Sequence, residues 1–143
     1  MTHHPGGPGY LVRATAPTRK TGPVARTGVQ LIDGKALYDG RTLAAWALLV
    51  ADRIVERCDA SRVVLFGSVA RGDDGPDSDI DLLVVMPIIG RRHDAAVRVL
   101  KELRDLPAPV DLIVVDPNHF EEEASVPGII RAALREGHVL AAT

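Results

Sequence analysis

Cysteine is almost absent from this chain of 143 residues, since Cys58 is the only one. A single thiol excludes an internal disulfide and favours a reducing compartment, for which the cytoplasm is our expectation. Cys58 lies near the end of an expected helix, where a cysteine is more often a packing residue than a nucleophile. Aromatic residues make up only 3% of the chain, so Val, Leu, Ile and Ala must build the core.

Long hydrophobic runs are also missing. The longest uncharged apolar run, residues 43–51, is too short to cross a bilayer. The N-terminus shows no charged start followed by an apolar stretch and a cleavage site, so we expect neither secretion nor membrane association. A chain of this length, 46% hydrophobic and 25% charged, has room for one globular domain and an arm.

Acidic residues are missing from residues 1–27, which hold four basic side chains, four prolines and four glycines. We therefore expect residues 1–28 to form a flexible basic arm and residues 29–143 to form the domain. A segment that docks on a partner or touches RNA is the alternative reading of the arm. The rest of the chain holds 13 bases and 19 acids, a net charge of −6, so direct nucleic-acid binding by the domain is not expected.

The domain alternates apolar runs with stretches of helical periodicity. Residues 29–38 predict a hairpin, because Asp33-Gly34 at its centre suits a tight primed turn. The remaining pattern predicts helices over residues 41–58, 91–105, 119–124 and 127–136, and strands over residues 62–66, 79–86, 109–115 and 138–142, the last at an edge. This order indicates an α/β (α+β) fold with a short mixed β-sheet flanked by helices.

The first candidate site feature is Gly67-Ser68, at the end of the strand over residues 62–66. A glycine there allows the backbone to approach a ligand, and exposed N–H groups with the Ser68 hydroxyl can bind phosphate oxygens. By itself this pair is weak evidence for a phosphate site, because Gly-Ser follows many strands.

The second feature is a pair of acids, Asp79 and Asp81, at the start of the next strand. Residues two apart in a strand point to the same face, so the two carboxylates lie side by side. Their repulsion is relieved by a cation between them, and oxygen ligands favour magnesium or manganese. The plainer alternative is a pair of solvated acids at a strand end.

Two further residues extend this group. Asp111 is second in the expected strand over residues 109–115, and it joins the acid pair if the strands align. Three converging carboxylates can hold two metal ions that clamp a phosphoryl displacement. A lone acid at a strand end is the alternative. Arg71, in the intervening loop, either binds a triphosphate or pairs with the loop acids Asp73 and Asp74, and the sequence leaves both open.

Together, residues 65–85 read LFGSVARGDDGPDSDIDLLVV. This stretch resembles the signature of the DNA polymerase β-like nucleotidyltransferases, in which a Gly-Ser corner is followed by Asp-x-Asp. Ala-Arg-Gly after the corner, and Ser-Asp-x-Asp-Leu, resemble the minimal nucleotidyltransferase subgroup in particular. The resemblance covers roughly residues 42–142, and its combined motif is specific.

The resemblance implies a nucleotidyltransferase fold and a set of site residues. Gly67, Ser68 and Arg71 would bind the nucleotide phosphates, while Asp79, Asp81 and Asp111 would be the catalytic carboxylates that hold two Mg²⁺ ions. The substrate would be a nucleoside triphosphate, expected to be ATP. An acceptor hydroxyl would attack the α-phosphorus, and pyrophosphate would leave.

The acceptor is the open question. About 100 residues of domain leave little room for an additional acceptor-binding domain. Minimal nucleotidyltransferases are similar to antitoxins that adenylylate a HEPN-type ribonuclease toxin, so we expect a protein adenylyltransferase (AMPylation) antitoxin that can form a hetero-oligomer with that toxin. The alternatives are nucleotidyl transfer to a small molecule such as an aminoglycoside, and a non-catalytic antitoxin that binds the toxin.

Overall fold

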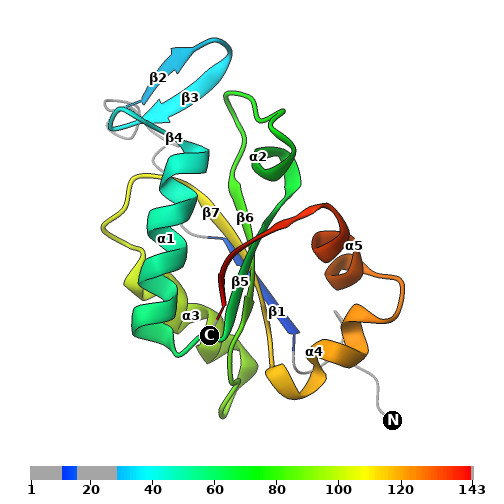
Figure 1. The fold of residues 1–143 in the computed structure, drawn as a ribbon. Coiled ribbons are helices and arrows are strands. Elements are labelled where there is room, and N and C mark those ends of the chain that lie inside the picture. The colour runs from blue at the N-terminus through cyan, green and yellow to red at the C-terminus, as the bar shows by residue number, and fades with distance from the viewer. Residues whose placement is uncertain (1–10, 16–28, 143) are drawn as a thin grey trace.

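The computed structural model describes residues 11–15 and 29–142 of the chain. Its main feature is a five-stranded sheet with the strand order β1-β7-β6-β5-β8 (Figure 1). The strands are β1 (Leu11–Thr15), β5 (Arg62–Phe66), β6 (Ile80–Val85), β7 (Val110–Val115) and β8 (His138–Ala142). Strands β6 and β7 run parallel, and the other pairs are antiparallel. The predicted mixed sheet is confirmed, with β8 at an edge.

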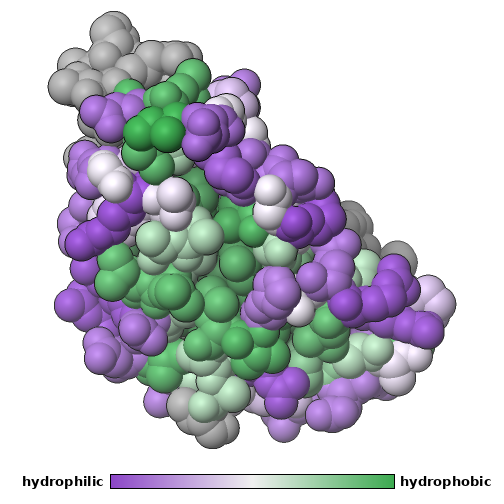
Figure 2. Space-filling view, turned by 45° about the horizontal axis from the view of Figure 1, so that its top comes forward, coloured by the Kyte–Doolittle hydropathy of each residue, from purple (hydrophilic) through white to green (hydrophobic). Residues whose placement is uncertain are grey.

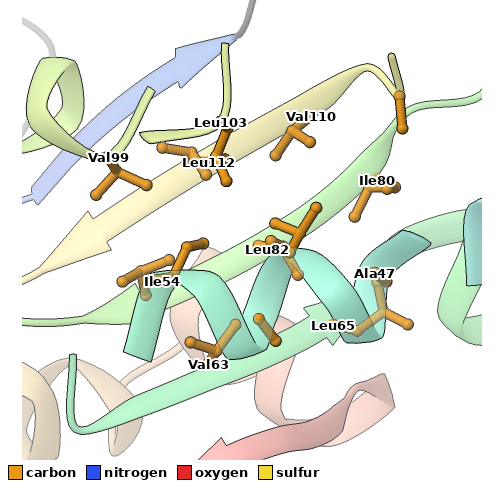
Figure 3. Close-up of a cluster of buried hydrophobic side chains, with 14 of the residues drawn as sticks. Ala47, Ile54, Val63, Leu65, Ile80, Leu82, Val99, Leu103, Val110 and Leu112 are labelled. Carbon is orange, nitrogen blue, oxygen red and sulfur yellow. The ribbon is translucent and has the colours of Figure 1, made fainter. Parts of the chain in front are cut away.

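Helices cover both faces of the sheet (Figure 1). They are α1 (Leu43–Cys58) and α3 (Arg92–Glu102) against one face, with α4 (Pro117–Ala124) and α5 (Ile129–Glu136) against the other. Alternation along the strands divides the core accordingly. In β6, Leu82 belongs to the α1–α3 layer and Leu83 to the α4–α5 layer. Figure 3 shows the α1–α3 layer, built from aliphatic side chains as the scarcity of aromatics predicts.

Helix α1 shows how local sequence sets an element. Thr42 caps its first turn, because its side-chain oxygen accepts a hydrogen bond from the Ala45 N–H at 3.1 Å. The helix ends at Asp59, whose backbone is left-handed with φ 60°. Trp46 is 6% exposed, as expected of a core residue.

A second, small sheet precedes α1. It consists of β2 (Val29–Ile32), β3 (Lys35–Tyr38) and β4 (Arg41–Thr42), in that order. The turn residues Asp33 and Gly34 have φ of 54° and 78°, the left-handed conformation that a primed turn requires. The predicted hairpin is therefore confirmed, and β4 extends it. We call residues 29–42 the N-terminal hairpin.

The structure differs from the sequence expectation at β1. Residues 11–15 fall inside the expected flexible arm, yet they pair with β7 from Leu11↔Val115 to Thr15↔Asp111. The physical reason is that β7 would otherwise present an open edge of unpaired N–H and C=O groups. Residues 1–10 and 16–28 of the expected arm lie outside the described residues.

A second difference is α2 (Gly67–Arg71), a short helix where the sequence suggested a polar loop. The chain leaves β5 through Gly67, whose φ is 76°. It turns once and ends at Gly72, whose backbone N–H donates to the Val69 carbonyl at 3.2 Å. Two left-handed glycines therefore define this turn.

None of the helices in the described ranges 11–15 and 29–142 is long and apolar enough to cross a membrane.

Candidate active site

The acids from two strands meet at one end of the sheet. In the parallel register of β6 and β7, Asp81 lies directly opposite Asp111. Asp79 immediately precedes β6, two residues from Asp81. The odd-numbered residues of β6 and β7 share the sheet face that carries Leu83 and Ile113 in the α4–α5 layer. The alignment on which the sequence argument for Asp111 depended is thus present.

Gly67 lies against this group. Strand β5 is antiparallel to β6, with Phe66 opposite Asp81, so the next residue turns beside the acid. A Cβ atom on Gly67 would overlap the Asp81 Oδ2 atom, closer than any real contact allows. Both this close approach and the φ of 76° require glycine. The glycine corner and the Asp81 carboxylate therefore lie in direct contact.

Ser68 connects the corner with the acid pair from the other side. Its hydroxyl shares a hydrogen bond with the hydroxyl of Ser78, with 3.2 Å between the two oxygens. Ser78 directly precedes Asp79 and also accepts a hydrogen bond from the Gly75 N–H at 2.8 Å. The loop 72–78 is thereby folded back onto the corner.

The structure resolves the surroundings of Arg71. Its Nε atom lies 3.3 Å from Asp73 Oδ2, and its Nη1 atom lies 3.2 Å from Glu136 Oε1. The other loop acid, Asp74, pairs with Lys35 instead. Arg71 remains about half exposed, so its guanidinium can also reach a ligand in solvent.

Glu136, which the sequence did not predict as a site residue, lies at the glycine corner. Its Oε1 atom accepts a hydrogen bond from the Gly67 N–H at 3.2 Å, and the same oxygen pairs with Arg71. The Gly67 N–H and the Arg71 guanidinium therefore already share one anionic acceptor, so the corner can accommodate an anionic oxygen. Glu136 is 69 residues from Gly67, and no local pattern signals this contact.

The donor chemistry of the acids suits a hard divalent cation, since Asp79, Asp81 and Asp111 offer only oxygen ligands. Within the part of the chain that the structure describes, no group of three or more His, Cys, Asp or Glu side chains already stands at metal-binding spacing. The three residues suit magnesium in ligand type, and the strand register places two of them, Asp81 and Asp111, side by side. Side-chain adjustment would be needed to bring three carboxylates onto one ion.

Residues 50–140 match the family model described as Nucleotidyltransferase domain. This range contains the glycine corner, Arg71 and all three acids, and it is well over half of the chain. The chain belongs to the nucleotidyltransferase domain family. Nucleotidyl transfer is the activity that this membership supports.

This nucleotidyltransferase is also similar to a solved structure from Sulfolobus solfataricus, which is provisionally named a nucleotidyltransferase. It shares 29% sequence identity over 56% of this chain and 72% of that chain, with a TM-score of 0.45. No curated protein matches the chain significantly.

Proposed function

We propose that this nucleotidyltransferase transfers AMP from ATP to a hydroxyl group of a partner protein, a HEPN-type ribonuclease toxin for which it is the antitoxin. The observation that supports nucleotidyl transfer at these residues is the position of Asp81, opposite Asp111 and against Gly67. Carboxylates and a phosphate-binding backbone turn are then within reach of one triphosphate.

In the proposed reaction, the acceptor oxygen forms a bond to the α-phosphorus of ATP. The bond from the α-phosphorus to the bridging oxygen breaks, and pyrophosphate leaves with the electron pair. The proton of the acceptor hydroxyl passes to a base, for which Asp111 is our candidate. The Gly67 N–H, the Ser68 hydroxyl and Arg71 would hold the phosphate oxygens and orient them for in-line attack.

Two magnesium ions, when bound, would neutralise charge on the phosphates and on the departing pyrophosphate. Asp79, Asp81 and Asp111 are the residues that would hold them. These roles follow from ligand type and strand register, together with the motif resemblance.

A protein acceptor is supported by the small extent of the described fold and by its exposed apolar side chains. The described residues form the main sheet, its helices and the N-terminal hairpin, with no further domain among them to hold an acceptor. Large apolar side chains are exposed on the hairpin, on α1 and on β8, at Leu31, Ile32, Leu48 and Val139. Figure 2 shows apolar side chains gathered across the middle of one face, with polar residues around them. Apolar side chains gathered on an exposed face favour a protein partner.

A labelling assay tests the proposal. The protein is incubated with magnesium and each α-labelled nucleoside triphosphate in turn, alone and with the product of the adjacent gene. We expect label from ATP on the partner, and a gain of one or more AMP units in its intact mass. The matched control is the Asp79→Asn/Asp81→Asn variant, which retains the size of both side chains and removes their charge.

The other outcomes select between the alternatives. Label on an aminoglycoside or another small hydroxyl compound, without a protein partner, would replace protein transfer by small-molecule transfer. Full neutralisation of the partner's ribonuclease by the Asp79→Asn/Asp81→Asn variant would show a binding antitoxin. Loss of neutralisation with retained binding supports the catalytic proposal.

A further inference from the structure

The N-terminal hairpin lies outside the family match, which begins at residue 50. In Figure 1 it projects beyond the end of α1, at the same end of the molecule as α2 and the loop that follows it. Any role of the hairpin in nucleotidyl transfer therefore depends on its own contacts with the rest of the protein.

Lys35 joins the hairpin to the loop 72–78. Its Nζ atom donates to Asp74 Oδ1 at 2.7 Å and to the Gly72 carbonyl at 2.9 Å. The Asp74 side chain is 6% exposed, and Asp74 is the buried charged residue of the described ranges. A buried carboxylate that loses its partner is strongly unfavourable, so Asp74 and the loop follow the position of Lys35.

The loop 72–78 is in turn coupled to both halves of the candidate site. At its start, the Asp73 N–H donates to the Ser68 carbonyl at 3.0 Å. At its end, Ser78 bonds to Ser68 and directly precedes Asp79. A displacement of Asp74 would therefore reach the glycine corner and the acid pair together.

The hairpin itself is firmly seated. The Trp46 Nε1–H donates to the Tyr38 carbonyl at 2.7 Å in a buried position, which fastens β3 to α1. Tyr38 is 1% exposed. Burial raises the pKa of its phenol, and the charges of Asp79 and Asp77 raise it further, so the phenol lies near these acids. The hairpin thus provides a fixed support beside the site.

We propose that Lys35 is a positioning residue for nucleotidyl transfer, which holds the loop 72–78, and through it Asp79 and the glycine corner, in the arrangement that binds a magnesium–nucleotide complex. This inference rests on the proposed function of the acids. Lys35 acts through Asp74 and does not touch the nucleotide. A purely stabilising ion pair would behave differently, because its loss would lower stability without changing nucleotide affinity in the folded protein.

The test compares Lys35→Met with Lys35→Arg, which retains the charge and the donors. The measurements are the dissociation constant of magnesium with α,β-methylene-ATP, by titration calorimetry, and the thermal unfolding midpoint. We expect Lys35→Met to weaken binding about 10-fold, as loss of an outer-shell partner does, and Lys35→Arg to restore most of it. Trp46 fluorescence follows whether the hairpin stays on α1, because its indole bonds to β3.

Arg53→Met is the matched control. Arg53 repeats the contact pattern of Lys35, since its Nη1 atom binds the Asp105 carboxylate and donates to the Glu102 carbonyl at 3.1 Å. Arg53 belongs to α1, and its contacts connect α1 to the end of α3, away from the acids. We expect Arg53→Met to lower the unfolding midpoint and to leave the nucleotide dissociation constant unchanged.

Asp74→Asn keeps the experiment decisive if Lys35→Met does not fold, because the amide oxygen can still accept from Lys35. A weaker loss of affinity in the same direction supports the inference. Affinity equal to that of wild type in Asp74→Asn, and in Lys35→Met where it folds, would overturn it while leaving the proposed function intact. A wild-type protein that binds no magnesium–nucleotide complex would overturn both.

Discussion

Gly67 is the residue at which the turn after β5 and the acid Asp81 constrain each other most directly. The absence of a side chain lets β5 turn through a left-handed conformation and lets the Asp81 carboxylate lie against the turn. Any L-residue would meet both a backbone penalty and the carboxylate. Backbone strain and site geometry are therefore tested by the same substitution.

We expect Gly67→Ala to reduce the free energy of unfolding by about 1–3 kcal/mol, because a non-glycine residue is strained at this φ. It should also abolish nucleotide binding, since the new Cβ displaces Asp81 Oδ2. Gly90→Ala is the control, because Gly90 has φ 74° but open space where a Cβ would lie. Urea unfolding and calorimetric titration would separate the two effects. Retained affinity in Gly67→Ala would show that Asp81 is not needed where it lies.

For Glu136 we predict that a substitution strengthens nucleotide binding. Its carboxylate accepts a hydrogen bond from the Gly67 N–H and pairs with Arg71, the groups proposed to bind phosphate. An incoming triphosphate must displace it, so Glu136→Gln should tighten magnesium–ATP binding about two- to fivefold, the effect of an exposed charge interaction below about 1 kcal/mol. Glu121→Gln, on the exposed side of α4, is the control. Weaker binding in Glu136→Gln would instead indicate that Glu136 contributes to the site.

At the scale of elements, Asp116 shows how one side chain joins a strand end to a helix. It caps α4, with Oδ1 accepting from the Asn118 N–H at 2.8 Å and Oδ2 accepting from the Ile88 N–H at 3.0 Å. The hydrogen bond from the Ile88 N–H, and after it the bond from the Asn118 N–H, holds the pKa of Asp116 below its usual range. The folded state thus favours the ionised form.

We expect Asp116→Ala to lower the free energy of unfolding by about 1 kcal/mol, the usual loss for an N-cap. A lowered pKa contributes stability that is present above the pKa of the unfolded chain and is lost as pH falls through the folded-state pKa. The advantage of wild type over Asp116→Asn should therefore shrink on acidification. Denaturant unfolding between neutral and acidic pH measures this difference. An advantage that is constant with pH would contradict the assigned hydrogen bonds.

At the scale of the whole molecule, β1 closes the edge of the sheet beside the site, because Thr15 lies opposite Asp111. Deletion of residues 1–28 should lower the free energy of unfolding by about 1–5 kcal/mol, given five paired positions. Deletion of residues 1–10, which leaves β1 in place, is the control. Equal stability of the two truncated proteins would show that the pairing contributes nothing in solution.

The sequence by itself determined most of the elements and the identity of the candidate site. Apolar, β-branched runs specify the central strands, and helical spacing specifies α1. The pair Asp33-Gly34 specifies a primed turn, because few residues tolerate left-handed φ. The elements depend mainly on interactions between neighbours in sequence, so local physical chemistry is sufficient to predict them. The family was indicated by the resemblance of the combined glycine corner and Asp-x-Asp motif to a known signature.

Only the tertiary structure decided the contacts that cross the chain. Lys35 meets Asp74 across 39 residues, and Glu136 meets Gly67 across 69. Strand β1 could not be predicted within its proline- and glycine-rich stretch, because its five residues form their hydrogen bonds with β7 and not with neighbours in sequence. Such pairings depend on where the sheet brings distant segments, and a pattern of residue types carries no record of that.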